Sequence, residues 1–254
     1  MNRIYREQRA RTGVSEKEIV LSNRVTPSLC VQTVAVIPAY NEADTIGPVI
    51  DETGGYVDRV VVVDDGSTDE TAAVARGHGA SVVEHIVNAG VGGAVRTGYR
   101  YAIRNGFDFV VQIDADGQHD PAQIPVLLER AENNDIVVAS RYLNDSHREY
   151  FWVRRLGIRF FTSAVNFLGR TEITDVTSGY RVYRVSALES ILHHSDKHWA
   201  VEQTLEAARN GFSIDEVSVE MPVREEGDSQ FTLDTFVLYP TRMLNVMLRV
   251  LIFR

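Results

Sequence analysis

Short apolar runs alternate with amphipathic stretches along the chain from residue 34 to residue 140. The apolar runs are rich in valine and isoleucine, and they occupy residues 34–37, 59–65, 80–85, 107–114 and 135–140. Between them, the pattern predicts helices at residues 42–53, 68–77, 91–105 and 121–133. Strands that alternate with helices in this way are typical of βαβ units. The sequence therefore predicts an α/β fold with a mostly parallel sheet flanked by helices.

After residue 140 the alternation gives way to aromatic and arginine-rich segments. Two apolar segments there, residues 150–169 and 239–253, carry narrow polar stripes at helical spacing. The stripes consist of Arg155, Arg159, Thr162 and Asn166 in the first segment, and of Arg242, Asn245 and Arg249 in the second. Each segment suits an amphipathic helix in the headgroup plane of a membrane, and equally a helix that packs on its own protein or on a second copy of the chain.

These patterns divide the chain into three expected parts. They are a polar N-terminal extension at residues 1–33, an α/β domain at 34–230, and a C-terminal amphipathic helix at 231–254 that serves a membrane surface or a homo-oligomer.

Net charge and cysteine content narrow the function classes. The formal net charge is -9, which argues against a nucleic-acid partner because no basic excess would neutralise phosphates. Cys30 is the single cysteine, so no internal disulfide is expected and a reducing compartment is favoured. Residues 1–24 lack the apolar core of a secretory signal, and no uncharged apolar run reaches the length of about 18 residues that spans a bilayer. We therefore expect a cytoplasmic protein.

Polar residues follow three of the predicted strands, as "PAYNE" at 38–42, "DDGSTD" at 64–69 and "DADGQ" at 114–118. In open α/β sheets, ligands bind beyond the carboxyl ends of the strands. Asp and Asn at strand ends are also common turn formers, and the spacing of Ser67 and Glu70 predicts a capping box at the start of a helix. Three such segments in register favour a binding site over three unrelated turns.

Other nucleotide and calcium motifs do not fit the sequence. The glycine-rich segment at 90–98 has Val95 where a dinucleotide fingerprint needs glycine, and Tyr99 where a P-loop needs lysine. An EF-hand loop that began at Asp114 would have Pro125 at its twelfth position, where calcium binding needs glutamate.

The aspartates of "DADGQ" lie one residue apart, and such close carboxylates repel each other unless a cation lies between them. A haloacid-type phosphatase would use the first of them, Asp114, as its nucleophile, although Gln118 stands where that class has threonine. The other interpretation is Mg²⁺ or Mn²⁺ on a nucleotide diphosphate. These ions take one or two protein carboxylates and complete their coordination with phosphate and water.

Six segments, in this order, resemble the family 2 glycosyltransferases of the GT-A fold. They are "VAVIPAYNEADTI", "VVVVDDGSTDET", "NAGVGGAVRTGYRYA", "DADGQHDP", "ASRY" and "TDVTSGYR". Within that family the likeness is to the dolichyl-phosphate mannose synthases and the bacterial polyprenyl-phosphate sugar transferases, and it covers residues 34–230. The resemblance implies a metal-dependent, inverting enzyme that moves one sugar from a UDP- or GDP-linked donor to a polyprenyl phosphate. It also implies a peripheral position on the cytoplasmic face of a membrane.

The resemblance also implies roles for individual residues. The nucleotide sugar is expected at Pro38, Ala39, Tyr40, Glu42, Asp64, Asp65, Gly93, Asp114, Ala115 and Asp116. The metal, Mg²⁺ or Mn²⁺, is expected at Asp114, Asp116 and Gln118. The acceptor phosphate is expected at Arg141, Arg155, Ser178 and Arg224, with Arg154 as an alternative to Arg155. Catalytic contributions are expected from Asp116, Arg141 and Asp175. Arg181 should help to shape the acceptor side, while Glu202 is either a further acid there or a solvated surface residue.

Two positions depart from the pattern of many relatives. Val91 and Gln230 stand where those relatives have lysine, which affects how the diphosphate and the lipid phosphate are held. Two further alternatives remain at this point: a family 2 enzyme with a soluble glycan or protein acceptor, and a nucleotide-sugar-binding protein without catalytic activity.

Overall fold

The computed structural model describes residues 31–143, 152–192, 195, 198–219 and 243–252, with the backbone alone for 152–158. Residues 1–31 and 32–254 form separate units, and the account below concerns the second. In it, the α/β architecture and the five expected strands are confirmed. The described residues form two further strands that the hydrophobic pattern did not reveal.

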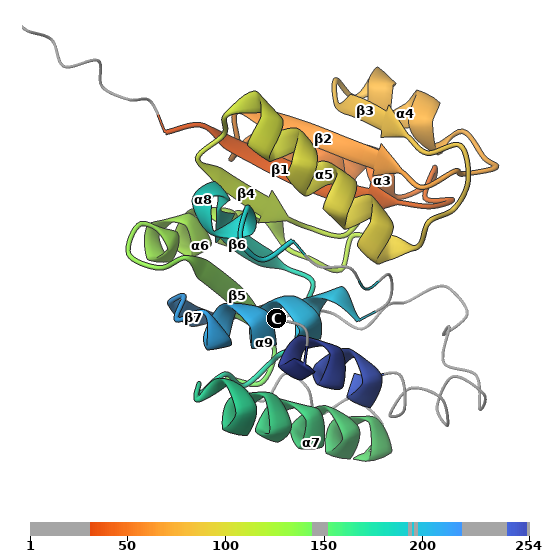
Figure 1. Ribbon diagram of the computed structural model, residues 1–254. Helices are drawn as coiled ribbons and strands as arrows, with labels where there is room; N and C mark the ends of the chain where they lie inside the picture. Colours follow the sequence, from red (N-terminus) through yellow and green to blue (C-terminus); the bar gives the residue numbers. More distant parts are fainter. Residues whose placement is uncertain (1–30, 144–151, 193–194, 196–197, 220–242, 253–254) are drawn as a thin grey trace, which may run out of the picture. The chain divides into compact units, whose positions relative to one another are not determined.

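The described strands form one seven-stranded sheet in the order β3-β2-β1-β4-β6-β5-β7 (Figure 1). The strands are β1 (Thr33–Ala39), β2 (Arg59–Asp64), β3 (Ser81–Glu84), β4 (Phe109–Gln112), β5 (Ile136–Ser140), β6 (Arg181–Arg184) and β7 (Ile214–Ser218). Every pairing is parallel except those of β6, which runs antiparallel between β4 and β5. Because of this reversal, the segment that enters β6 reaches the same sheet edge as the segments that leave β4 and β5.

Helices cover both faces of the sheet. The helices are α3 (Ile46–Gly54), α4 (Thr71–Gly77), α5 (Val91–Asn105), α6 (Ile124–Ala131, after the 3-10 turn η1, Pro121–Gln123), α7 (Trp152–Gly169), α8 (Val185–Leu188) and α9 (Trp199–Arg209). Apolar residues of α3, α4 and α6 pack against one face of the sheet, and those of α5, α8 and α9 pack against the other. The result is a three-layer α/β/α arrangement, which buries the valine-rich strands on both sides.

A third apolar core lies outside the sheet. It joins α7, α9 and a helix at residues 243–252, called here the C-terminal helix and drawn in dark blue in Figure 1. Phe161 and Val165 of α7 pack there with Met243 and Met247 of the C-terminal helix. None of the described helices is long and apolar enough to cross a membrane.

Helix α5 packs closely on strand β1 at Gly98. A Cβ atom placed on Gly98 would lie 2.1 Å from Cγ1 of Val36, far inside van der Waals contact. Glycine at this position therefore lets the helix rest directly on the strand, which brings the start of α5 against the strand ends that carry the polar segments.

One local expectation is wrong. Ser67 does not form a capping box with Glu70: α4 begins at Thr71 without a side-chain cap from its N-cap residue, and the Ser67 hydroxyl is instead bonded to Asp64. Part of the polar stripe of α7 faces the protein interior, whereas Arg159 of the same stripe is exposed. Thr162 is buried, and Asn166 bonds the backbone N–H and carbonyl of Ile173.

Candidate active site

The donor side of the site is built at the carboxyl ends of β1 and β2. Asn41 adopts a left-handed φ of 55°, a conformation that asparagine tolerates better than most residues. Its backbone N–H donates to the Ser67 hydroxyl at 2.9 Å, and its side-chain oxygen accepts from the backbone N–H of Thr68 at 2.8 Å. These bonds join the turn after β1 to the loop after β2, and they leave the ring of Tyr40 46% exposed beside them.

Asp64 and Asp65 are both buried but have different partners. Asp64 accepts from the backbone N–H of Ser67 at 3.3 Å. Asp65 Oδ1 lies 2.7 Å from His85 Nδ1 and accepts from the backbone N–H of Ala89 at 2.9 Å. His85 Nε2 in turn lies 2.9 Å from the hydroxyl of Thr97 on α5. Asp65 therefore ties the loop before α5 to the end of β2.

Five other residues expected at the donor lie at the same edge. Pro38 and Ala39 end β1 opposite Val63 and Asp64, and Ala115 is buried between the two aspartates of the next segment. Gly93 is buried in the first turn of α5, and Glu42 accepts from the hydroxyl of Thr45 at 2.8 Å. The structure thus brings the donor-side residues together at one edge of the sheet.

Asp114, Asp116 and Gln118 follow β4 in one tight loop. All three are partly exposed, and Gly117 between them has a φ of 73°. Asp116 Oδ1 accepts from the backbone N–H of Gln118 at 3.1 Å, which fixes the side chain of Asp116 in an Asx turn. Burial and the neighbouring carboxylate of Asp116 raise the pKa of Asp114, and a nearby cation would favour its ionised form.

His119 closes this loop from behind. Its Nδ1 accepts from the backbone N–H of Asp114 at 3.1 Å, its Nε2 lies 3.7 Å from Asp114 Oδ2, and its ring stacks on Tyr180 at a centroid distance of 4.9 Å. Burial lowers the pKa of His119 despite the attraction of Asp114, so the neutral ring is favoured. Gly179 leaves room for the carboxylate, since a Cβ there would lie 3.2 Å from Asp114 Oδ2.

The residues expected on the acceptor side centre on an ion pair between Arg141 and Asp175. Arg141 Nε donates to Asp175 Oδ2 at 2.7 Å and Nη2 donates to Oδ1 at 2.9 Å, while Nη2 also donates to the Thr177 hydroxyl at 2.9 Å. The side chain of Asp175 is fully buried and that of Arg141 is 13% exposed. Burial alone would raise the pKa of Asp175, but the Arg141 guanidinium and the Thr177 bonds lower it below its usual value.

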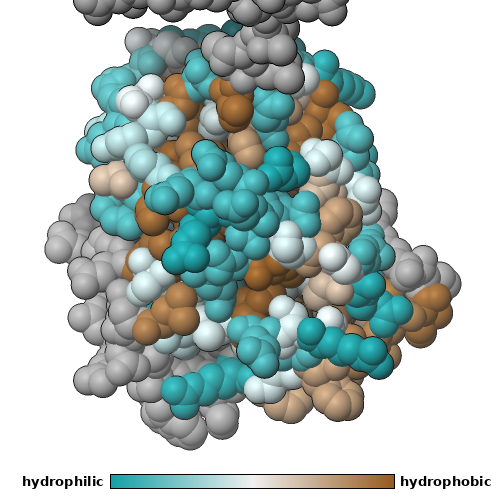
Figure 2. Space-filling view, turned by 90° about the vertical axis from the view of Figure 1, so that its left-hand side faces the viewer, coloured by the Kyte–Doolittle hydropathy of each residue, from teal (hydrophilic) through white to brown (hydrophobic). Residues whose placement is uncertain are grey.

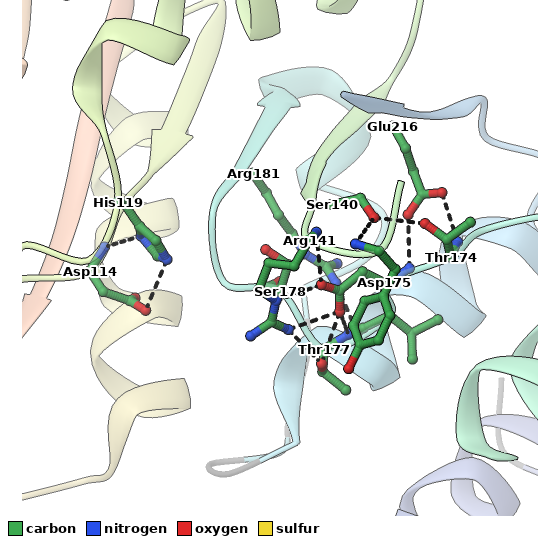
Figure 3. A network of polar contacts seen from close by, with 12 residues as sticks. Asp114, His119, Ser140, Arg141, Thr174, Asp175, Thr177, Ser178, Arg181 and Glu216 are labelled. Carbon is green, nitrogen blue, oxygen red and sulfur yellow. Dashed lines mark hydrogen bonds and ion pairs between the residues drawn. The ribbon is translucent and has the colours of Figure 1, made fainter. Parts of the chain in front are cut away.

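The segment that carries Asp175 is fastened to β5 and β7. Glu216 accepts from the backbone N–H groups of Thr174 at 2.7 Å and Asp175 at 2.9 Å, and burial raises the pKa of its carboxyl group. The hydroxyls of Ser140 and Thr174 lie 2.7 Å apart. Figure 3 draws this cluster in one view with Asp114 and His119. The segment that carries Asp175 also reaches the Asp114 carboxylate, because a Cβ atom on Gly179 would lie 3.2 Å from Asp114 Oδ2. The residues expected on the donor and acceptor sides therefore meet at Asp114.

Arg181 holds the backbone before β6 from within the protein. It is fully buried, and it donates to the carbonyl oxygens of Ser178 at 2.7 Å and Val176 at 3.0 Å and to the Thr204 hydroxyl at 2.9 Å. The backbone that precedes β6 is thereby held against α9. The hydroxyl of Ser178 is buried and has no hydrogen-bond partner in the described part of the chain.

Other expected residues are placed only in part. Arg154 and Arg155 lie in α7 where the backbone alone is described, and Arg224, Gln230 and Arg242 lie outside the described residues. Glu202 is not a solvated surface residue, because it is 1% exposed and accepts from the backbone N–H of Ser195 at 2.8 Å.

The loop of Asp114 and Asp116 fits a divalent ion that arrives with a phosphate ligand. Among the described residues, no three His, Cys, Asp or Glu side chains gather to hold a metal by themselves. Two carboxylates and one amide in a single turn match Mg²⁺ or Mn²⁺, which takes its remaining ligands from phosphate and water.

Comparison with known proteins agrees with this architecture. The family model of glycosyl transferase family 2 matches residues 34–192. Polyprenol monophosphomannose synthase of Mycolicibacterium smegmatis is 32% identical over 218 residues, which cover 79% of this chain and 81% of that protein. Undecaprenyl-phosphate mannosyltransferase of Micrococcus luteus is 31% identical over 213 residues, which cover 79% and 88% of the two chains. The chain therefore belongs to glycosyl transferase family 2 and is a glycosyltransferase, which removes the phosphatase alternative.

A solved structure supports the fold. Glucosyl-3-phosphoglycerate synthase from Mycobacterium tuberculosis, in complex with Mn²⁺, UDP and phosphoglyceric acid, superposes with a TM-score of 0.67 at 22% identity, covering 87% of this chain and 78% of that one. The GT-A fold expected from the sequence is thus confirmed.

Sequence reasoning named Arg141 and Asp175 but not their pairing, because their spacing in the chain gives no sign of it. It missed Glu216, which lies in a strand whose pattern is polar.

Proposed function

We propose that the protein is a metal-dependent, inverting transferase that moves a single sugar from a nucleotide diphosphate sugar to a polyprenyl phosphate at a membrane surface. The observation that carries this proposal is the approach of the segment that carries Asp175 to the Asp114–Gln118 loop, since the loop suits a metal-bound diphosphate and the segment holds the guanidinium of Arg141. The names of the relatives from Mycolicibacterium smegmatis and Micrococcus luteus point to the same acceptor class.

The reaction follows from the chemistry of the acceptor. A phosphate oxygen attacks the anomeric carbon while the bond from that carbon to the diphosphate breaks, so a single displacement inverts the configuration. The acceptor phosphate is ionised near neutral pH, and no strong general base is needed. Asp114, Asp116 and Gln118 would hold the divalent ion, which supplies positive charge for the leaving diphosphate. Arg141, whose orientation Asp175 fixes, contributes positive charge on the acceptor side.

The exposed faces of α7 and the C-terminal helix support a membrane surface. Phe160 and Phe167 of α7 and Leu244, Leu248 and Ile252 of the C-terminal helix are exposed, with Phe167 at 84%. Arg159 and Arg249 are exposed on the same two helices. Aromatic and aliphatic side chains with flanking arginines suit insertion into the headgroup region. Figure 2, by contrast, shows a side of the protein whose centre is covered by hydrophilic residues.

The direct test supplies purified protein with polyprenyl phosphate in detergent micelles, Mn²⁺, and a panel of UDP- and GDP-sugars. We expect one donor to give a lipid-linked sugar detectable by mass spectrometry, with an anomeric configuration opposite to that of the donor. The variant Asp116→Asn serves as the control and should lose transfer. Transfer to soluble glycans but never to polyprenyl phosphate would contradict the proposed acceptor, and retention of configuration would contradict direct displacement.

A further inference from the structure

The loop that carries the expected metal ligands is closed by a residue outside the ligand set. His119 Nδ1 accepts the backbone N–H of Asp114 at 3.1 Å, so the first and last residues of "DADGQH" are joined. Asp116 and Gln118 lie inside the ring that this bond closes, and the Asx bond from Gln118 N–H to Asp116 at 3.1 Å tightens it further. The geometry of the ligand set therefore depends on the position of one imidazole.

The imidazole of His119 is held by Tyr180, which lies just before β6. His119 is 8% exposed, and its ring lies nearly parallel to that of Tyr180, with an interplanar angle of 15°. The Tyr180 hydroxyl donates to the backbone carbonyl of Asp120 at 3.0 Å. Tyr180 directly precedes β6 and belongs to the segment that also carries Asp175. This segment therefore contacts the end of the Asp114–Gln118 loop through Tyr180.

The bond to Asp114 also determines the tautomer of His119. Since Nδ1 accepts a backbone proton, the neutral ring carries its own proton on Nε2. That N–H lies on the side of Asp114 Oδ2, at a distance of 3.7 Å between the heavy atoms (Figure 3). On the other side of the carboxylate, Gln112 Nε2 makes a long contact of 3.5 Å with Oδ1, and Gln112 is oriented by the Tyr99 hydroxyl at 2.9 Å.

We propose that His119 is a positioning residue, which fixes the Asp114–Gln118 loop in the shape that binds a divalent cation together with a nucleoside diphosphate. This inference rests on the metal-dependent function proposed above. Groups that orient metal ligands from behind typically change metal affinity by about 10–100-fold when they are removed. His119 acts through Asp114 and Asp116 and need not touch the substrate.

Two substitutions separate the hydrogen bond from the packing. His119→Phe keeps a ring that can stack on Tyr180 but has no acceptor for the Asp114 N–H. His119→Asn loses the stack but offers its side-chain oxygen near the position of Nδ1. The matched control is His78→Phe, which makes the same change at another histidine–aspartate contact. His78 Nδ1 lies 2.9 Å from Oδ1 of Asp51, a residue of α3.

Binding is measured by titrating each protein with UDP and with GDP, in the presence and absence of Mn²⁺, by calorimetry, and by following the Mn²⁺ paramagnetic resonance signal. We expect His119→Phe to weaken Mn²⁺-dependent nucleotide binding by about tenfold or more, with metal-free nucleotide binding within about twofold of the wild type. His119→Asn should recover most of the loss, and His78→Phe should bind as the wild type does. A general structural defect would weaken metal-free binding as well.

Three results would overturn the inference. They are unchanged Mn²⁺-dependent binding in His119→Phe, equal losses in His119→Phe and His119→Asn, or a parallel loss of metal-free binding in both. If the wild type binds both nucleotides with the same affinity with and without Mn²⁺, the metal-dependent function itself fails, and the inference fails with it. The wild-type titration thus distinguishes the two failures.

Discussion

The buried ion pair between Arg141 and Asp175 allows a quantitative prediction. Asp175 has no exposed side-chain surface, and it receives two bonds from the Arg141 side chain in addition to those from Thr177. Substituting Arg141→Met would remove the positive partner and leave a carboxylate in the protein interior. Breaking a buried pair in this way costs about 3–5 kcal/mol. Because Arg141 keeps 13% of its side chain exposed, we expect the lower end, about 3 kcal/mol.

This loss is large enough to measure by urea unfolding, followed by the fluorescence of the buried Trp199. A loss of about 3 kcal/mol changes the folding equilibrium by roughly a hundredfold, and with an m-value of about 3 kcal/mol/M it lowers the midpoint by about 1 M urea. The double variant Arg141→Met, Asp175→Asn should be no less stable than Arg141→Met alone, since it has no buried charge. The control Arg130→Met breaks an exposed pair with Asp215 and should lose under about 1 kcal/mol.

The pH dependence provides a second measurement of the same pair. Folding lowers the pKa of Asp175, so the ionised carboxylate contributes stability above its unfolded-state pKa of about 3.9, and this contribution is lost as the pH falls below that value. Asp175→Asn should lack this part of the acid destabilisation. If the two single losses simply add in the double variant, within about 0.5 kcal/mol, the pair is not coupled and the reasoning is refuted.

Two further predictions concern the loop before α5 and the exposed apolar helices. Asp65→Asn should weaken the contact with His85. We therefore expect faster amide hydrogen exchange in residues 85–90, with little change in β2. Unchanged exchange would show that the loop is held by other contacts. Phe167→Glu together with Leu248→Glu should abolish sedimentation with anionic lipid vesicles, while nucleotide binding in solution persists. Co-sedimentation at wild-type levels would place the membrane contact elsewhere.

The hydrophobic pattern predicted most of the sheet but not all of it. Strands β1, β2, β4 and β5 are buried on both faces, which gives the continuous apolar runs that are easy to recognise. Strand β6 reads "RVYR" and β7 reads "IDEVS", and neither has such a run. Arg181 of β6 is buried because it donates to carbonyl groups of the segment just before it and to groups of α9, and short-range patterning carries no trace of the partners on α9.

The candidate site was predictable to the extent that its residues are local in sequence. Asp114, Asp116 and Gln118 lie in one loop, so their proximity follows from the chain itself. Arg141 and Asp175 are 34 residues apart, and their pairing depends on the antiparallel placement of β6. The predicted capping box is absent because the Ser67 hydroxyl bonds to Asp64 and to the backbone N–H of Asn41 instead. Asn41 lies in the turn after β1, so this partner is not visible in the local sequence.

The position of β6 has a consequence for engineering the enzyme. The residues proposed to bind the donor lie before residue 121, and the described residues proposed to bind the acceptor lie after residue 135. On this proposal, a chimera joined within α6 would exchange acceptor recognition between relatives while keeping one nucleotide specificity. Such a splice must preserve the register in which Val111 faces Val182 and Phe109 faces Arg184, because β6 of the new half has to pair with β4 of the old one. The exchange must also keep the contacts of Tyr180 with His119 and Asp120, which cross the same boundary.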